Sequence, residues 1–363
     1  MKKIILVFVF FVSTFIPSFV FASYHFSNFR GKPPIHIYGK LSKIPIGITP
    51  SQIKKIYNLP ENGGHGTIAI IGAYDDKSIE KDLGDFSKQF NLSECTTKSN
   101  CLEKHEMSSS IKTNSNWNME TTLDVEWAHA IAPQAKILLV EATTPSGANF
   151  LKAIDYAANR KDVTAVSMSW GGKEFPEEIS LDSHFQNNYG IVFFASSGDN
   201  GTGASWPASS PYVVGVGGTT LSLNTDGSVK KETAWNGSGG GISVYEKEPS
   251  FQNNYSIAMD KGYRAIPDVA YNADPESGFP IIRNGVWRTV GGTSAGAPQW
   301  AALSTLGSGA TNINFYKDKA SSNHAIYFTD ITSGTNGSCG YLCDARKHYD
   351  YVTGLGSPLT VNF

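Results

Sequence analysis

The strongest constraint on the fold is a repeated order of strand and helix patterns. Residues 67–74 form an almost unbroken apolar run, which is typical of a strand buried on both faces. Strands that alternate with amphipathic helices predict one α/β domain with a mainly parallel sheet, helices on both faces, and active groups at the carboxyl ends of strands. Further strands are predicted at residues 135–140, 164–169, 191–195, 212–216 and 286–290, and helices at residues 49–57, 79–90, 119–131, 148–158 and 177–188.

The N-terminus has the order of a secretory signal. Lys2 and Lys3 precede an apolar run, and small residues end at Ala22. We therefore predict a signal peptide at residues 1–22 and a secreted or periplasmic location. An uncleaved anchor is the alternative, although polar residues and a proline interrupt the span. Residues 23–48 are interpreted as an N-terminal arm or short propeptide.

The charge of the chain is mildly acidic. The 30 basic and 32 acidic residues give a formal charge of −2, and loss of Lys2 and Lys3 with the signal peptide makes it −4. Lysines occur in short pairs without the dense basic patch that phosphate binding needs. Nucleic acid is therefore excluded as an expected partner.

The four cysteines form two close pairs, Cys95 with Cys101 and Cys339 with Cys343. In an exported chain, this pattern predicts two local disulfides. A shared metal site is disfavoured because neither pair has CxxC spacing.

Residues 290–300 form a glycine-dense turn that places the Ser294 hydroxyl before an apolar segment. Glycines let a substrate backbone approach, and a following helix offers unpaired N–H groups where negative charge can gather. The pattern favours a nucleophilic serine. The alternative is that Ser294 only caps the helix, the commonest role of serine there.

Two arrangements with a histidine base fit poorly. An Asp, His, Ser order is absent because residues 1–74 contain no aspartate, and His65 is interpreted as a turn residue. A Gly-x-Ser-x-Gly elbow at Ser294 with Asp330 and His348 would suit an α/β-hydrolase esterase. Only 69 residues follow Ser294, too few for the strand and helix units that this fold places after its nucleophile.

Two carboxylates offer a third base. Glu120 and Asp124 are four residues apart, so on a helix they share one face. Repulsion and partial burial would raise at least one pKa, giving a carboxylate that accepts the serine proton and a neighbour that orients it. The alternative is a solvated acidic face. The apolar stripe of Leu123, Trp127 and Ile131 beside the pair favours a half-buried position.

Four motifs in order resemble the sedolisin family of serine-carboxyl peptidases. They are the Glu120-x3-Asp124 pair, residues 197–201, residues 264–269 and residues 292–298. The likeness covers residues 49–363 and implies a sedolisin-like peptidase domain with a subtilisin-like three-layer fold.

The resemblance implies roles for four residues. Ser294 would be the nucleophile, Glu120 the general base and then acid, and Asp124 its orienting partner. Asp199 would take the oxyanion-hole position, where a protonated carboxyl can donate to the developing oxyanion. The expected activity is a serine-type endopeptidase at acidic pH that forms an acyl-enzyme.

The C-terminal region resembles the family's calcium loop and implies one structural Ca²⁺. Asp330 and Asp350 would give side-chain oxygens, and the carbonyls of Ile331, Arg346 and His348 would complete the shell. Glycine is common in the family where Arg346 and His348 stand. The alternative is a metal-free loop closed by a disulfide.

We expect an extended peptide substrate to pair with the main chain of residues 167–172 and 239–241, where glycines leave the backbone accessible. The predicted substrate-binding residues are Ser169, Trp170, Gly171, Gly198 and Gly240. Peptides or proteins are the expected partners of a monomer with no stable membrane association after signal cleavage.

Two departures from the family leave questions open. Members commonly carry a long folded propeptide, whereas about 40 residues separate the predicted signal from the first buried strand. Gly72 stands where some members extend the carboxylate network, and Asp75 or Asp76 could compensate. The rival function is that of an exported, catalytically silent protein that keeps the fold for binding.

Overall fold

The centre of the molecule is a sheet of parallel strands. The computed structural model describes residues 25–317 and 324–363, so the predicted signal peptide lies outside the described residues. The strand order is β10-β9-β7-β5-β2-β4-β3, and β13 also pairs with β9. All of these pairings are parallel except that of β10 with β9. The strands are β2 (Thr67–Ala73), β3 (Leu102–Glu106), β4 (Lys136–Ala142), β5 (Val163–Met168), β7 (Val192–Ser196), β9 (Val213–Leu223), β10 (Val229–Ala234) and β13 (Val269–Asn272).

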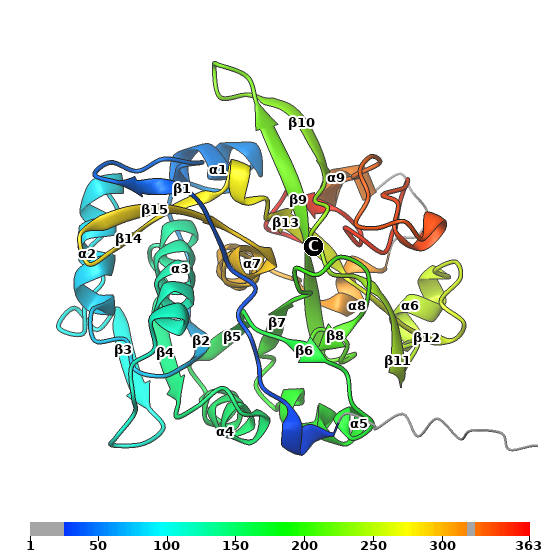
Figure 1. Cartoon of the computed structure of the whole chain (residues 1–363), viewed down its shortest axis with the longest axis horizontal. Helices are drawn as coiled ribbons and strands as arrows, with labels where there is room; N and C mark the ends of the chain where they lie inside the picture. The colour runs from blue at the N-terminus through cyan, green and yellow to red at the C-terminus, as the bar shows by residue number, and fades with distance from the viewer. Residues whose placement is uncertain (1–24, 318–323) are drawn as a thin grey trace, which may run out of the picture.

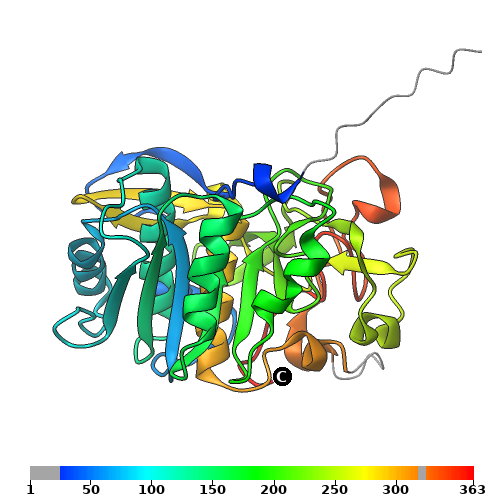
Figure 2. The same cartoon turned by 90° about the horizontal axis from the view of Figure 1, so that it is seen from below.

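Helices cover both faces of this sheet. Ile68 and Ile70 of β2 belong to the core beneath α3 and α7, whereas Ala69 and Ile71 belong to the core beneath α4. The sheet therefore lies between α4 and the pair α3 and α7 (Figure 1), and α4 lies in front of the strands in Figure 2. The three-layer α/β prediction is confirmed. The helices are α1 (Pro50–Ile56), α2 (Ile79–Phe90), α3 (Ser115–Ile131), α4 (Gly147–Ala158), α5 (Glu178–Leu181), α6 (Ser250–Tyr255), α7 (Gly296–Leu306), α8 (Asn312–Phe315) and α9 (His324–Tyr327).

Local sequence explains where the first helices begin. At α1, Thr49 and Gln52 form a capping box, with the Thr49 amide donating to Gln52 Oε1 at 2.9 Å. At α3, the Asn114 side chain accepts from the amides of Asn116 and Trp117 at 3.1 and 3.2 Å. These caps satisfy N–H groups that have no partner inside the helix.

The two central helices lack a solvent face. In α3, 14 of the 17 residues are buried, and in α7 only Ser304 and Leu306 are more than slightly exposed. Both helices therefore contact neighbours on all sides.

Several elements differ from the sequence predictions, among them the following three. The helix expected at residues 177–188 is only α5 followed by a 3₁₀ turn, Asp182–Phe185. The strand expected at residues 212–216 continues to Leu223 as β9, because β10 and β13 pair with its second half. Strand β1 (His36–Ser42) was not predicted, since its residues are nearly all exposed and show no alternation.

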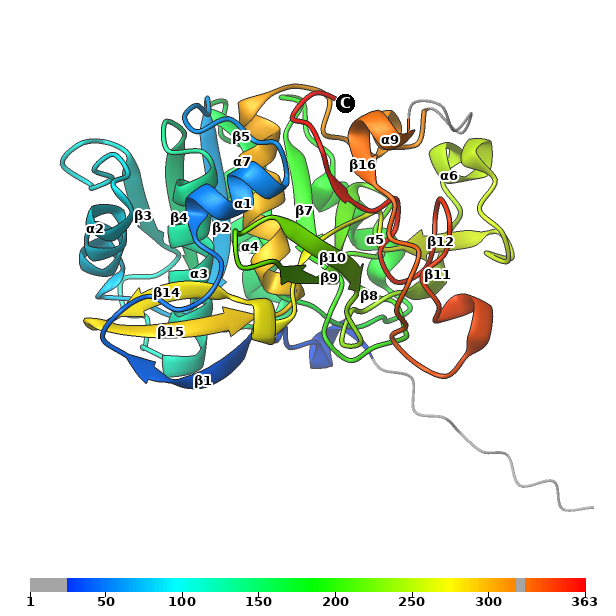
Figure 3. The same ribbon diagram turned by 90° about the horizontal axis from the view of Figure 1, so that it is seen from above.

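Small sheets surround the central one. Strands β1, β15 and β14 form an antiparallel ribbon at one edge of the molecule (Figure 3). This ribbon leads the chain from β15 into α7. The remaining strands are β6 (Gly172–Lys173), β8 (Ser205–Trp206), β11 (Gly241–Lys247), β12 (Tyr263–Ile266), β14 (Phe279–Arg283), β15 (Val286–Gly291), β16 (Phe328–Thr329) and β17 (Ser357–Pro358).

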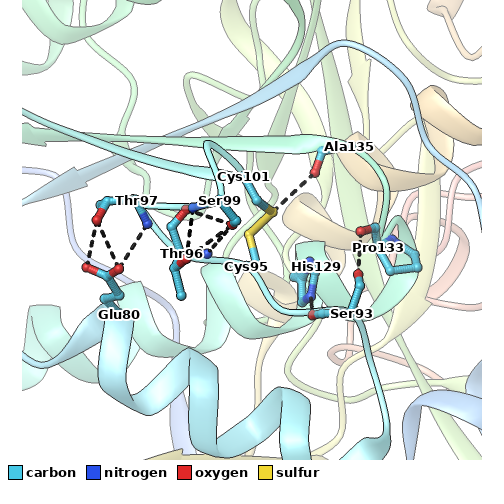
Figure 4. The surroundings of a disulfide bond; sticks show 10 residues. All are labelled: Glu80, Ser93, Cys95, Thr96, Thr97, Ser99, Cys101, His129, Pro133 and Ala135. Carbon is cyan, nitrogen blue, oxygen red and sulfur yellow. Dashed lines mark hydrogen bonds between the residues drawn. A yellow bond between two sulfur atoms is a disulfide. The ribbon is translucent and has the colours of Figure 1, made fainter.

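Both predicted disulfides, Cys95–Cys101 and Cys339–Cys343, are present. The first lies beside His129, whose Nε2 donates to the Ser93 carbonyl at 2.9 Å (Figure 4). Because its sulfurs are bonded to each other, this group is a packing cluster and offers no thiolate for a metal. No helix of the described residues has both the length and the apolar character needed to cross a bilayer.

Candidate active site

Ser294 lies on a 3₁₀ turn between β15 and α7. Gly292 before it has φ 126°, and a Cβ there would lie 1.9 Å from the Pro34 carbonyl oxygen. Ser294 does not cap α7, because the N-cap is Ala295 and no side chain bonds there. Its buried hydroxyl instead donates to the Pro34 carbonyl at 2.9 Å.

Glu120 projects from α3, which packs directly on α7. It is 1% exposed, so it is more deeply buried than the half-buried position expected. Burial, followed by the charge of Asp124, raises the pKa of Glu120 well above its usual range, and the Ser294 hydroxyl lowers it. Its oxygens have no hydrogen bond of ordinary geometry, yet the Ser294 hydroxyl is near enough to act on its titration.

Asp124 lies one turn further along α3 and is also 1% exposed. Its Oδ1 accepts from the Ser169 hydroxyl at 2.6 Å, and Ser169 also donates to the Ser294 carbonyl at 3.1 Å. Burial raises the pKa of Asp124, while the hydrogen bond from Ser169 and the nearby Glu120 carboxyl lower it. Two adjacent buried carboxyls of this kind share protons and titrate as a unit.

Asp199 lies on the turn that follows β7, and its side chain reaches the Ser294 turn from a different element than Glu120 and Asp124 do. Its Oδ1 accepts from the Thr293 amide and hydroxyl, each at 2.8 Å, and its Oδ2 lies 2.9 Å from His36 Nε2. Burial raises the pKa of Asp199, and the bonds from His36 and Thr293 lower it. The structure thus brings Ser294, Glu120, Asp124 and Asp199 together around one hydroxyl.

A cavity of about 880 Å³ lies next to these groups. It is lined by Asp199, by glycine-rich backbone and by residues of the N-terminal arm. The arm crosses over α7 in Figure 1, where it is drawn in dark blue. Its lining combines exposed glycine backbone with polar and charged side chains, which suits an extended peptide bound through its main chain.

The predicted substrate-binding residues divide into two groups. Gly171 and Gly198 line the cavity. The side chains of Ser169 and Trp170 point elsewhere, Ser169 to Asp124 and Trp170 to the Ile71 carbonyl at 2.8 Å. Gly240 is buried against the Tyr351 carbonyl, and its neighbour Gly239 lines the cavity instead.

The candidate calcium loop lies apart from the nucleophile. Both oxygens of Asp330 accept from the His348 amide at 3.0–3.1 Å, and Asp350 Oδ2 accepts from the Arg346 amide at 3.1 Å. Asp350 is 1% exposed, and burial raises its pKa to about 7. Within residues 25–317 and 324–363 it has no ion pair. Its Oδ1 accepts from the Val352 and Thr353 amides, each at 2.8 Å, and its Oδ2 accepts from the Thr353 hydroxyl at 3.0 Å. A hard cation held by this carboxylate would share oxygens that already accept these hydrogen bonds. Ile331 is also buried within the loop.

The histidine alternatives receive no structural support. His65 is an exposed turn residue before β2, as interpreted from the sequence. Asp330 and His348 contact each other in the C-terminal loop, and among the described residues neither bonds to Ser294.

The region around Gly72 contains a separate acidic network. Asp75 and Glu141 both pair with Lys104, and the Asp76 amide donates to Glu141 at 2.7 Å. Burial raises the pKa of Glu141 to about 7. Asp75 and Asp76 are therefore engaged with Lys104 and Glu141.

Sequence reasoning did not identify the arm residues at the site, namely Lys32, Pro34 and His36. They lie more than 250 residues before Ser294 in a segment without periodicity. The pairings of His36 with Gly291 across β1 and β15, and of Lys32 with Gly171, bring them there. No local pattern reports such a pairing.

Comparison with known proteins agrees with this arrangement. The sequence profile of the subtilase family matches residues 49–312. Kumamolisin from Bacillus sp. (strain MN-32) is 32% identical over 88% of this chain and 63% of its own length, and sedolisin from Pseudomonas sp. (strain 101) is 27% identical over 86% and 60%. The chain therefore spans about three fifths of the length of these relatives.

Solved structures show the same likeness. Pseudomonas sedolisin, a serine-carboxyl proteinase complexed with pseudo-iodotyrostatin, superposes with a TM-score of 0.75 at 27% identity, covering 86% of this chain and 96% of that chain. Sphericase, at 19% identity and a TM-score of 0.56, shares the fold. The chain belongs to the subtilase family and, within it, to the sedolisin family.

Proposed function

We propose that the protein is a serine-type endopeptidase that works at acidic pH. The observation that carries the proposal is the contact of the Ser294 hydroxyl with a peptide carbonyl, that of Pro34, at 2.9 Å. A nucleophile must reach such a carbonyl in an extended peptide, and here buried carboxyls surround it. Pseudomonas sedolisin, to which the chain is similar, is a serine-carboxyl proteinase, and this supports the same reaction.

The residues divide the chemistry between them. Glu120 takes the Ser294 proton as the hydroxyl attacks the carbonyl carbon, and Asp124 orients Glu120 from one turn away. Asp199, when protonated, donates to the oxygen that becomes negative. Glu120 then gives its proton to the leaving amine, and a water that it activates hydrolyses the acyl-enzyme at Ser294.

We expect activity at acidic pH because the proposed role of Asp199 requires a protonated carboxyl. Asp199 donates a hydrogen bond only as a carboxylic acid, and an ionised carboxylate would repel the oxyanion. Burial raises the pKa values of Asp199, Glu120 and Asp124 in the same direction. The site therefore keeps protons at a pH where exposed carboxyls have lost theirs.

Hydrolysis of a peptide mixture by Ser294→Ala tests the proposal. At acidic pH the variant should lose activity by about 10⁴-fold or more, as nucleophile removal does in serine peptidases. Ser304→Ala is the matched control, because Ser304 lies on α7, the helix that follows Ser294, and donates to the Ala301 carbonyl. New peptide termini are counted by mass spectrometry at acidic and neutral pH.

Two outcomes would contradict the proposal. Equal activity of wild type and Ser294→Ala, or an alkaline optimum, would exclude a serine-carboxyl mechanism. Loss of ester hydrolysis in Asp330→Asn would instead favour the α/β-hydrolase alternative. Peptide binding without turnover by wild type would favour the catalytically silent alternative.

We also propose that the C-terminal loop binds one structural Ca²⁺. Asp330 and Asp350 would hold it with the carbonyls of Ile331, Arg346 and His348. The ion would supply positive charge between two acidic side chains and so stabilise the loop. Export through the N-terminal signal and a monomeric state complete the proposal.

A further inference from the structure

Three buried carboxylates come together beside the contact of α2 and α3 with strand β14 (Figure 1). Asp76 is on the loop after β2, Asp82 is on α2 and Glu126 is on α3, and their exposed fractions are 1%, 0% and 0%. Removing a carboxylate from water is unfavourable unless a partner takes the place of the water. The oxygens of these three side chains therefore need partners.

One oxygen of each carboxylate is anchored by hydrogen bonds. The donors are main-chain amides, joined at Asp76 by one serine hydroxyl. Outer hydrogen bonds of this kind orient the carboxylates that bind metals. The bonds run from the Ser78 amide and hydroxyl to Asp76 Oδ1 at 3.0 and 2.9 Å, from the Asn284 amide to Asp82 Oδ1 at 2.9 Å, and from the Ile282 amide to Glu126 Oε2 at 3.1 Å.

The other oxygen of each carboxylate has no partner. Among residues 25–317 and 324–363, Asp76 Oδ2, Asp82 Oδ2 and Glu126 Oε1 are buried and accept no hydrogen bond. Burial, followed by the charges of Asp82 and Asp76, raises the pKa of Glu126 well above its usual range. The three carboxylates thus repel one another, and a cation bound to their free oxygens would offset this repulsion.

The positive groups that the chain has nearby bond elsewhere. Burial raises the pKa of Asp76 and the charge of Arg283 lowers it, yet in the described part of the chain no ion pair joins an arginine to any of the three carboxylates. Arg288 donates to the carbonyls of Arg283 and Val286 at 3.2 and 2.9 Å. Lys104 donates to the main-chain carbonyl of Asp76 at 3.0 Å. The free oxygens are left for a partner from outside the chain.

The kind and number of these oxygens favour Mg²⁺. Carboxylate oxygens suit hard divalent cations. Since one oxygen of each carboxylate already accepts a hydrogen bond, each carboxylate offers a single oxygen, and three such ligands are fewer than the about six to eight that Ca²⁺ takes. Mg²⁺ keeps several of its own waters and needs few protein ligands.

We propose that Asp76, Asp82 and Glu126 bind one hydrated Mg²⁺ through these three free oxygens. The site is built from other elements than the C-terminal loop, and it goes beyond the proposed peptidase activity without depending on it. The anchoring amides of Ile282 and Asn284 belong to the hairpin of β14 and β15. The ion would therefore stabilise the packing of this hairpin on α2 and α3.

Titration calorimetry with Mg²⁺ tests the site in the full chain carrying Asp350→Asn, which removes a carboxylate of the C-terminal loop. This parent should bind one Mg²⁺ at pH 7. Adding Asp82→Asn should weaken the affinity by at least about tenfold, because one ligand loses its negative charge. Asp85→Asn is the matched control, since Asp85 lies on the same helix but its side chain is 40% exposed and pairs with Lys81. It removes the same charge and should keep the affinity of the parent.

Circular dichroism and melting temperatures without Mg²⁺ show whether each variant folds. Asp82→Asn keeps an oxygen that can accept from the Asn284 amide, so we expect it to fold. Asp76→Asn is a second variant with the same expected loss of affinity, and it provides the test if Asp82→Asn does not fold.

Binding of Mg²⁺ that is weakened in these variants would support the site whether or not the wild type cleaves peptides. A parent that binds no Mg²⁺, or folded Asp82→Asn and Asp76→Asn chains with the affinity of the parent, would overturn it. Binding of Ca²⁺ but not of Mg²⁺ at these residues would overturn the choice of ion.

Discussion

The carboxyls that we propose to be catalytic, Glu120 and Asp124, lie next to each other and to hydroxyl groups. Among the described residues, no ion pair involves Glu120 or Asp124. Each is completely buried, and the nearest polar partners are Ser294 and Ser169. Burial without a cation raises the pKa of a carboxyl, so its ionised form is a stronger base, and it is this ionised form of Glu120 that would accept the Ser294 proton.

Replacing Glu120 tests this role directly. We expect Glu120→Gln to lower kcat by about 10²–10⁴-fold at acidic pH, because the amide cannot accept the Ser294 proton. Glu126→Gln is the matched control on the same helix. Glu126 is equally buried and accepts from the Ile282 amide at 3.1 Å, which an amide oxygen can also do.

Steady-state kinetics and thermal unfolding of both variants give the answer. If Glu120→Gln kept wild-type kcat while Glu126→Gln lost it, the general base would be assigned wrongly. A fall in melting temperature without a fall in kcat would indicate a structural role for Glu120.

A second acidic cluster couples small elements beside the cleft. Glu174 accepts from Ser243 and from the Val244 amide of β11, and Glu178 of α5 accepts from the Phe175 amide at 2.9 Å. Burial and the charge of Glu174 raise the pKa of Glu178 to about 9. The nearby Glu246 is raised to about 8, mainly by burial.

This cluster should make the protein less stable as the pH rises. Since the folded pKa of Glu178 lies above its unfolded value, its contribution is fully present below about pH 4.5 and is lost as the pH rises through about 9. We expect Glu178→Gln to gain about 1–3 kcal/mol over wild type at pH 7 and little at pH 4.

Melting temperatures of the wild type and of Glu178→Gln, measured between pH 4 and pH 9, check the prediction. Glu177→Gln, next to Glu178 but half exposed, should leave the pH dependence of stability nearly unchanged. Parallel stability profiles for wild type and Glu178→Gln would show that Glu178 is not protonated in the folded state.

The elements that could be predicted are those whose own residues carry a local pattern of spacing or hydrophobicity. The i, i+4 spacing placed Glu120 and Asp124 on one helix face, and the apolar run at β2 gave the buried strand. The acidic cluster was not predicted, because its members are polar and come from separate elements. Strand β1 was missed because its solvent-exposed side chains carry no periodicity, and its register with β15 is set only in the folded chain.

For the molecule as a whole, the C-terminal loop provides a test of the proposed metal. We expect a calcium chelator to lower the melting temperature and added Ca²⁺ to restore it, equivalent to about 3 kcal/mol at a hundredfold excess over Kd. Asp350→Asn should abolish the response because it removes a buried carboxylate.

Asp344→Asn is the control, since Asp344 lies in the same loop but is exposed and pairs only weakly with Arg346 at 3.5 Å. It should keep the full response to calcium. If neither chelator nor Ca²⁺ changes the melting temperature of the wild type, the loop is metal-free and is closed by the Cys339–Cys343 disulfide.

The burial of α3 on almost every side has a consequence for how such an enzyme can change. A substitution on most faces of this helix alters core packing as well as the surroundings of the proposed catalytic carboxyls, so few single replacements are neutral. The working pH can therefore be changed more easily, in evolution or by engineering, at residues of other elements that contact Glu120 or Asp124. Ser169, just beyond β5, is one of these, because its hydroxyl lowers the pKa of Asp124 without belonging to the helix.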